Sequence, residues 1–152
     1  MAAFRVGRER GRVRMAEQGK ISFELVSPEQ LLLSEEVKMV TVPGASGVFG
    51  VKPRHAPLIS SMKPGVVAIH REDAEKADQR FFVDSGFAEV TQERCTVLAE
   101  HVIDVATMNR SDLETELKNA REDVADAKTD KERAKAEQRV AMTEHKLRAL
   151  QS

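Results

Sequence analysis

The side chains that could do chemistry are few and lie far apart in the sequence. His55, His70, His101 and His145 show no metal-ligand spacing, and neither a His-Glu-x-x-His nor a Cys-x-x-Cys pattern is present. We therefore expect each histidine to be a surface or turn residue. The single cysteine, Cys95, stands at a predicted strand start, and a neighbouring arginine is its only local activating group. This context favours a buried structural cysteine over a nucleophile.

Two other patterns look like sites until their geometry is considered. The glycine-rich run Gly44–Gly50 has the composition of a phosphate cradle, but β-type segments flank it on both sides. A cradle needs a helix N-terminus to direct its amides, so a turn between strands is predicted instead. Glu35 and Glu36 are adjacent in a strand pattern, where neighbouring side chains point to opposite faces and cannot share a substrate. The residues therefore predict no active site, no metal and no resident cofactor.

Composition excludes several classes of partner. The chain has 152 residues, a formal net charge of −1, and neither Trp nor Tyr. It therefore lacks the global positive field and the usual stacking platforms of nucleic-acid binders. No apolar run approaches the roughly 20 residues that a membrane-spanning helix needs. One cysteine excludes an internal disulfide, which fits a reducing compartment.

The first residues differ from the rest of the chain. Residues 1–14 contain five arginines, one glutamate and few large apolar side chains. We expect residues 1–19 to be a disordered basic extension, because such a segment buries too little to offset its ordering entropy. An upstream start, with Met15 as the natural first residue, is favoured over a transit peptide or an arm for anionic surfaces.

Residues 20–103 have the pattern of a β domain. Ile21, Phe23 and Leu25 alternate with polar residues, as in a half-buried strand. After a turn and the apolar run at residues 31–33, strands are expected at residues 37–42, 65–70, 80–84, 87–90 and 96–100. The alternation within residues 37–42 breaks at Met39-Val40, which predicts a bulge or two-sided burial. Many short strands with regular turn signals predict an antiparallel β-sandwich or barrel.

Residues 104–152 have a helical pattern. Capping-box sequences begin at Ser111 and Thr129 and predict two helices with a break near Lys128-Thr129. Their apolar seams are Leu113, Leu117, Ala120, Val124 and Ala127 in the first helix, and Ala136, Val140, Thr143, Leu147 and Leu150 in the second. Facing seams predict an antiparallel helical hairpin. The expected fold class is α+β by segments, with an N-terminal antiparallel β-sandwich followed by this C-terminal α-helical hairpin.

Two β segments resemble a known family. They are the run Val42–Leu58, closed by Lys63–Val67, and the run Phe82–Val90, which continues into Cys95–Glu100. Over roughly residues 20–150 the chain resembles the epsilon subunit of bacterial F-type ATP synthase, the counterpart of the mitochondrial delta subunit. The resemblance implies a non-catalytic rotor-stalk subunit that contacts the gamma subunit and the membrane c-ring. It also implies that the hairpin is a regulatory element that reaches the alpha/beta catalytic head.

The resemblance extends to location and to individual residues. It implies a peripheral position on the cytoplasmic side of a bacterial inner membrane, in preference to the matrix side of a mitochondrial inner membrane. The rotor-interface positions it assigns here are Gly44, Gly47, Val48, Gly50, His55 and Pro57. Some family members carry a glutamate where this chain has Val48. Stiff proline-bounded loops suit a contact that transmits torque.

The family's nucleotide motif, Ile/Leu-Asp-x-x-Arg-Ala, is incomplete in this chain. Ile103 and Asp104 match it, but Thr107 and Met108 stand in place of Arg-Ala, and the next arginine is Arg110. Without that guanidinium we expect no ATP binding. From the residues alone, an alternative is a free-standing β-sandwich binding or scaffold module that oligomerises through its helical hairpin.

Overall fold

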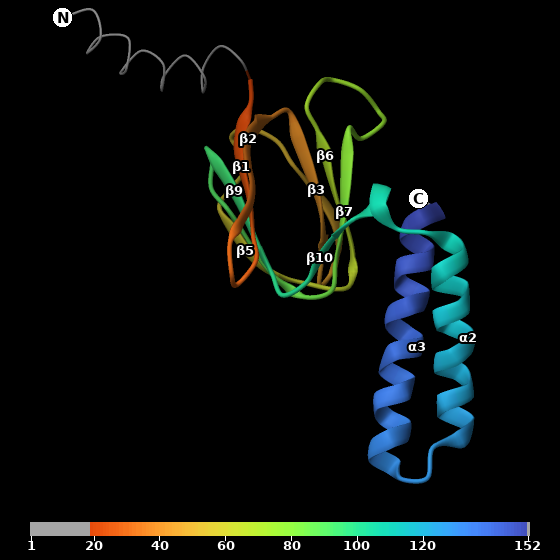
Figure 1. Ribbon diagram of the computed structural model, residues 1–152. Coiled ribbons are helices and arrows are strands. Elements are labelled where there is room, and N and C mark those ends of the chain that lie inside the picture. Colours follow the sequence, from red (N-terminus) through yellow and green to blue (C-terminus); the bar gives the residue numbers. More distant parts are fainter. Residues whose placement is uncertain (1–18, 152) are drawn as a thin grey trace, which may run out of the picture.

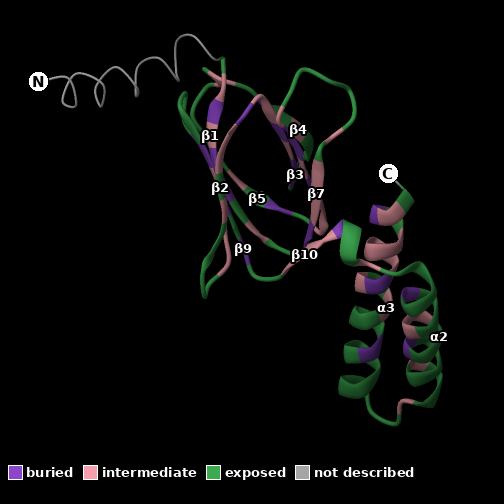
Figure 2. Cartoon of the chain, turned by 45° about the horizontal axis from the view of Figure 1, so that its top comes forward, coloured by how far each residue is buried: buried purple, intermediate pink, exposed green. Residues whose placement is uncertain are grey.

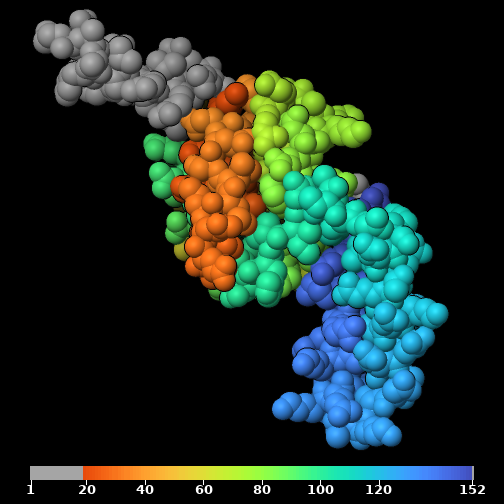
Figure 3. Space-filling view, in the orientation of Figure 1, coloured from red at the N-terminus to blue at the C-terminus, as the bar shows by residue number. Residues whose placement is uncertain are grey.

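The computed structural model describes residues 19–151, and both the predicted basic extension before Gly19 and the Met15 start lie outside that range. A β-sandwich is followed by a pair of antiparallel helices (Figure 1). The helices project away from the sandwich and touch it only near one end of the pair (Figure 3). The predicted fold class is therefore confirmed.

The strands belong to one continuous sheet in the order β10-β7-β6-β3-β5-β8-β9-β1-β2, with β4 paired to β3. The strands are β1 (Ile21–Val26), β2 (Leu31–Val37), β3 (Met39–Gly44), β4 (Gly47–Val51), β5 (Leu58–Met62), β6 (Gly65–His70), β7 (Gln79–Val83), β8 (Gly86–Val90), β9 (Arg94–Ala99) and β10 (Val102–Asp104). A single pairing, Gly44 with Met62, joins β3 to β5 and forms the corner between the two layers. One pair departs from the predicted antiparallel pattern, because β1 runs parallel to β9.

The core lies between the two layers. In β1 the side chains of Ile21, Phe23 and Leu25 are fully buried, as their alternation predicted. Valines from the facing layer, including Val40 and Val67, join them in one apolar cluster. Figure 2 shows the buried positions running along the strands of the sandwich, whereas the helices are exposed over most of their surface.

The predicted strand at residues 37–42 is wrong in its boundaries. Val37 ends β2 and Met39 begins β3, with Lys38 between them donating its backbone N–H to the carbonyl of His70 at 2.8 Å. The break in alternation therefore marks a change of strand, and it is neither a bulge nor two-sided burial. The short strands β4, β5 and β10 were not predicted as separate elements, and β2 was recognised only as the apolar run at residues 31–33. The other expected strands are confirmed to within two residues.

The C-terminal region consists of the 3-10 turn η1 (Val105–Thr107), α2 (Arg110–Asp126) and α3 (Asp130–Gln151). The predicted cap at Ser111 is wrong, because Asn109 caps α2 by accepting the backbone N–H of Asp112 at 3.1 Å. The predicted cap at Thr129 is confirmed, since its hydroxyl accepts the N–H of Glu132 at 3.1 Å. The Glu132 carboxylate accepts the backbone N–H of Lys128 at 3.0 Å, where a capping box would have the N–H of Thr129.

The predicted helical seam is confirmed, and it is thin. Its buried members are Leu113 and Ala120 on α2, with Ala136 and Thr143 on α3. Ion pairs at its rim join Arg139 to Asp123 at 2.6 Å and Arg121 to Glu144 at 3.5 Å. A second, smaller apolar cluster connects the hairpin to the sandwich: Phe82, Val105 and Ala149, with Val66, Ile103, Met108, Met142 and Leu150 packed around them.

Candidate functional site

The first candidate surface is the tight turn between β3 and β4. Gly44 pairs with Gly47 across this turn, and Gly47 has φ of 137°, which L side chains rarely adopt. A Cβ at Gly44 would lie 2.7 Å from a ring carbon of Phe49. Gly47 is therefore required by its backbone conformation, and Gly44 by the close approach of the Phe49 ring. Beside them, Val48 is 74% exposed and contributes almost none of its side chain to the core.

A rigid loop follows β4. The N–H of His55 donates to the carbonyl of Lys52 at 3.2 Å, which closes a turn with Pro53 and Arg54 at its centre. Arg54 has φ of 69°, a left-handed conformation normally left to glycine or asparagine at this turn position. His55 Nδ1 also lies 2.7 Å from the Ala56 carbonyl. A non-glycine residue held in this conformation is typical of a loop with a specific task.

The predicted rotor-interface residues fall into two groups. Gly44, Gly47 and Val48 line the same groove on the outside of β3 and β6. The His55 ring instead lies beside Phe49, with the ring centroids 6.4 Å apart. Adjacent strand residues point to opposite faces, so Val48 and Phe49 point away from each other. His55 and the exposed Pro57 therefore form a second group, and Gly50 lies beside Met39, apart from both.

Sequence reasoning missed the most exposed apolar surface of the sandwich. Strand pairing places Phe87 opposite Leu98, Leu98 opposite Val26, and Val26 opposite Leu31, so these side chains form a row across β8, β9, β1 and β2. Phe87 is 57% exposed and Leu98 48%. Ile59 on the neighbouring strand β5 is 70% exposed. We refer to Val26, Leu31, Ile59, Phe87 and Leu98 as the outer apolar face.

A signal for this surface was present in the sequence. In β8 the buried side chains are Ala88 and Val90, which places Phe87 on the same face as Glu89. An aromatic residue at a solvent-facing position of an alternating strand indicates an interface more often than a core. In β9 the same argument applies to Leu98, which alternates with buried Val97 and Ala99.

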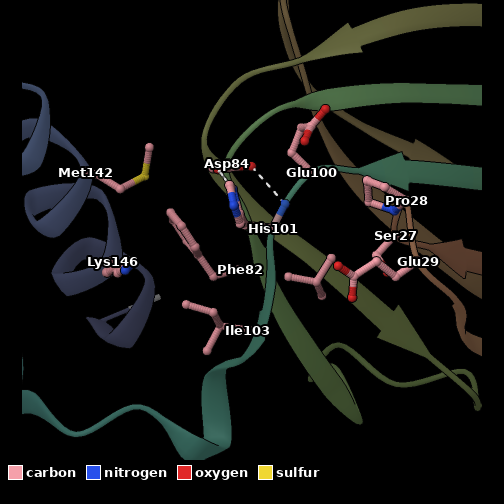
Figure 4. Close-up of a pocket in the computed structure, with 11 residues that line it drawn as sticks. Ser27, Pro28, Glu29, Phe82, Asp84, Glu100, His101, Ile103, Met142 and Lys146 are labelled. Carbon is pink, nitrogen blue, oxygen red and sulfur yellow. Dashed lines mark hydrogen bonds and ion pairs between the residues drawn. The ribbon is translucent and has the colours of Figure 1, made fainter.

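A cleft of about 740 Å³ separates the sandwich from α3. Figure 4 shows Met142 and Lys146 of α3 on one side, and the segment between β9 and β10 that carries His101 on the other. His101 Nδ1 lies 2.5 Å from an oxygen of Asp84, and its backbone N–H donates to the other oxygen at 3.2 Å. Two more carboxylates, Glu29 and Glu100, line the cleft. Carboxylates outnumber the lysine here, which opposes the binding of a polyphosphate.

The two residues that match the nucleotide motif have structural contacts. Ile103 packs into the apolar cluster between the sandwich and the hairpin. Asp104 uses one carboxylate oxygen to accept the N–H of Ala106 at 2.9 Å, which caps η1. Its other oxygen accepts a hydrogen bond from Gln79 Nε2 at 3.2 Å. Both oxygens of this carboxylate are therefore already hydrogen-bonded.

Glu35 is half-buried and forms an ion pair with Arg71, whose pKa is raised by this hydrogen bond and by the charge of Glu35. Arg71 Nη2 also donates to Gln79 at 2.7 Å. Because Gln79 bonds Asp104, the chain of polar contacts runs from β2 to β10, which are the two ends of the sheet order. These side chains close the open edge of the sandwich.

Cys95 is fully buried, as expected, and burial raises the pKa of its thiol to about 12. Such a thiol is not a nucleophile at neutral pH. The expectation that each histidine is a surface or turn residue is wrong for His70, which is buried in the last position of β6 with Nδ1 3.1 Å from the Ala74 carbonyl. Within residues 19–151, no three His, Cys, Asp or Glu side chains cluster closely enough to hold a metal ion.

The helices of the described region include none with both the length and the apolar character to cross a membrane. Comparison with known families matches residues 20–105 to the β-sandwich domain of the ATP synthase delta/epsilon chain, and residues 109–152 to the C-terminal domain of the ATP synthase epsilon chain.

Relatives and solved structures agree with these two matches. The ATP synthase epsilon chain of Rhodospirillum centenum is 48% identical over 84% of this chain and 90% of its own length. That of Paramagnetospirillum magneticum is 50% identical over 80% and 89%. A chain in the mitochondrial ATP synthase of Euglena gracilis has the same fold, with a TM-score of 0.75 at 20% identity, over 87% of this chain and 82% of that one. The chain therefore belongs to the ATP synthase epsilon chain family and is a non-catalytic subunit of the enzyme's central stalk.

Proposed function

We propose that this chain couples the gamma shaft and the catalytic head of a bacterial F-type ATP synthase to the membrane c-ring. It carries out this role as a peripheral subunit on the cytoplasmic side of the inner membrane. The observation that carries the proposal is the outer apolar face, because a sandwich with a complete core of its own exposes a row of large apolar side chains. Such a row on a folded domain fits a permanent protein partner.

The outer apolar face is the proposed docking surface for the gamma subunit. Phe87 and Leu98 lie at the middle of the row, and Ile59 and Leu31 lie towards its ends. Burying one such side chain in an interface contributes roughly 1.5–3 kcal/mol. Several together would hold the sandwich on the shaft while the shaft rotates, so the two would turn as one body.

The turn at Gly44–Gly47 and the loop at residues 52–57 are the proposed contacts with the c-ring. Val48 is exposed on the first, and His55 lies half-buried on the second, beside Phe49. Both backbones are held by glycine and proline geometry, so little entropy is lost when they meet a partner. With Val48 in place of a carboxylate, the contact at the first position is apolar.

Two substitutions separate these surfaces. Phe87→Glu should weaken one-to-one binding to the gamma subunit by at least about tenfold, since it replaces a buried apolar contact by a desolvated charge. Val48→Lys should leave that affinity unchanged but lower proton-driven ATP synthesis in reconstituted vesicles. Each substitution should cost only about 0.5 kcal/mol of the isolated chain's stability, because both sites are exposed.

The same binding experiment tests the whole proposal. A chain that self-associates through its helices and ignores gamma would support the scaffold alternative and refute the rotor assignment. Equal loss of gamma binding in Phe87→Glu and Val48→Lys would refute the division into two surfaces.

The hairpin is the proposed contact with the catalytic head, and we infer that it acts without bound nucleotide. The cleft beside Ile103 is lined by Asp84, Glu29 and Glu100, with Lys146 as its lysine. A missing charge-assisted bond removes roughly 1.5–3 kcal/mol from phosphate affinity. Calorimetric titration of the isolated chain with ATP and magnesium should show no binding up to millimolar nucleotide. A micromolar dissociation constant would overturn this inference.

A further inference from the structure

The start of strand β7 contacts both ends of the C-terminal region. Gln79 Nε2 donates to Asp104, the residue that leads into the hairpin, at 3.2 Å. The next residue, Arg80, donates from Nη1 to the carbonyl of Ala149, in the last turn of α3, at 2.8 Å. Because the helices are antiparallel, the entry and the exit of the hairpin lie at the same end, next to β7 (Figure 1).

The two contacts differ in how firmly they are held. Asp104 belongs to β10, which pairs with β7 through the backbone, and its carboxylate also caps η1. The last turn of α3 has no strand pairing with the sandwich and meets it through side chains. Arg80 supplies a cation to a C-terminal carbonyl of α3, where the helix leaves carbonyls without intrahelical partners and its dipole is negative. The bond is therefore charge-assisted.

A small apolar cluster supports this end of the helix. Only Phe82 of β7, Val105 of η1 and Ala149 itself are buried in it, and five partly buried apolar side chains pack around them. Ala149 offers a single methyl group, and the rest of the long hairpin extends beyond the sandwich (Figure 3). A small contact area therefore positions the whole hairpin, and the Arg80–Ala149 hydrogen bond contributes a large part of the free energy of docking.

We propose that Arg80 is the positioning residue that keeps the hairpin docked on the sandwich. When the Arg80–Ala149 contact is lost, the hairpin pivots about the segment from Asp104 to Asn109, while the sandwich and the helical seam stay intact. The inference rests on the proposed function only in assigning the released hairpin to the catalytic head.

The experiment measures the distance between sandwich and hairpin in the full chain. Spin labels are attached through Gln92→Cys on an exposed sandwich turn and Lys131→Cys at the far end of the hairpin. The buried Cys95, with its pKa raised to about 12, does not compete for the label. We expect one narrow distance for the parent. Arg80→Met should shift the ratio of docked to undocked hairpin by about tenfold towards the undocked form.

Two comparisons show whether the charge is responsible. Arg80→Lys should restore part of the docked population, because the cation remains near the helix C-terminus. Arg94→Met removes an exposed arginine of β9, which lies in the layer that does not contain β7 and is 3.8 Å from Glu24. This substitution should leave the distance between the labels unchanged. An unchanged narrow distance in a folded Arg80→Met chain would overturn the proposal. So would equal broadening in Arg94→Met.

Salt provides a test that needs no substitution at Arg80. Raising the sodium chloride concentration from about 0.05 M to about 1 M shortens the Debye length from more than about 10 Å to about 3 Å, which weakens a partly exposed charge contact. The undocked population of the parent should therefore grow with sodium chloride, and constancy across this range would refute the role of Arg80 even if Arg80→Met failed to fold. The isolated chain is used throughout, so failure here would leave gamma binding, and with it the proposed function, untouched.

Discussion

The sandwich and the hairpin are stabilised in opposite ways. Between its layers the sandwich buries Phe23, Ile21 and Leu25 of β1 together with many valines from strands that are distant in sequence. The hairpin buries mainly alanines, with Leu113 and Thr143, between helices that are neighbours in sequence. Large apolar burial fixes one permanent arrangement, whereas a thin alanine seam leaves a region that partners can move. The sandwich is thus suited to transmit force without changing its shape, and the hairpin is suited to change its position when a partner binds.

The largest effect should come from emptying the sandwich core. Phe23→Ala should lower the free energy of unfolding by about 3–5 kcal/mol, because the ring is fully buried between the layers. Urea denaturation followed by circular dichroism measures the loss. Phe87→Ala is the matched control at an exposed site, and it should cost less than about 1 kcal/mol. Similar losses for both would mean that the outer apolar face belongs to the core.

A change in the seam should affect the hairpin alone. Ala120 has no exposed surface, and Ala120→Leu should force the helices apart at a cost of about 1–3 kcal/mol. Amide hydrogen exchange should then quicken throughout α2 and α3 while β1 and β9 keep their protection. If the strands lose protection in parallel, the chain unfolds as one unit and the contrast between the two regions is false.

The helix caps predict a smaller and more local effect. Thr129→Ala should cost about 1 kcal/mol and speed exchange in the first turn of α3, because the hydroxyl accepts the N–H of Glu132. Ser111→Ala should change α2 very little, since Asn109 is the cap there. Greater fraying of α2 in Ser111→Ala than in Asn109→Ala would contradict this assignment.

The smallest effect concerns pH at the docked end of α3. Burial, with the charge of Arg148 next in size, lowers the pKa of His145 below its ordinary 6.5, and Arg148 Nη2 donates to His145 Nδ1 at 2.8 Å. The folded state therefore prefers the neutral ring. Stability is unaffected well above pH 6.5, declines as the unfolded chain binds the proton, and levels off below the folded pKa.

Melting temperatures at about pH 7.5 and about pH 5.5 measure this effect. The parent should lose slightly more stability on acidification than His145→Asn. His55→Asn is the control, in the loop between β4 and β5, and should follow the parent. A larger acid loss in His145→Asn would reverse the sign argued here.

Sequence patterns predicted the fold where each residue's environment follows from its neighbours. The alternation in Ile21–Leu25 and the seam from Leu113 to Ala127 each determine one buried face, and both are confirmed. The change of strand at Lys38 was missed because it depends on a bond to His70, a long-range partner that no local pattern reveals. The cap at Asn109 was missed because Ser111 offered an equally good capping sequence two residues later.

The candidate surfaces were predicted less well, for a similar reason. Family resemblance pointed to the turn at Gly44–Gly47 and to His55, whose glycines and prolines are visible in the sequence. The row formed by Phe87, Leu98 and Leu31 exists only once β1 lies between β9 and β2. A surface whose residues come from several strands can be recognised only when the order of those strands in the sheet is known.

The parallel pairing of β1 with β9 bears on the order in which the chain can fold during synthesis. β1 is synthesised early and can pair with β2 as soon as β2 is made. Its second neighbour is β9, so Phe23 has no partner on that side until Cys95 has been synthesised. Until then the nascent hairpin presents an unpaired edge and half of the future core to its surroundings. The sandwich can close only when almost all of it has been translated, so early strands are the part most in need of a chaperone.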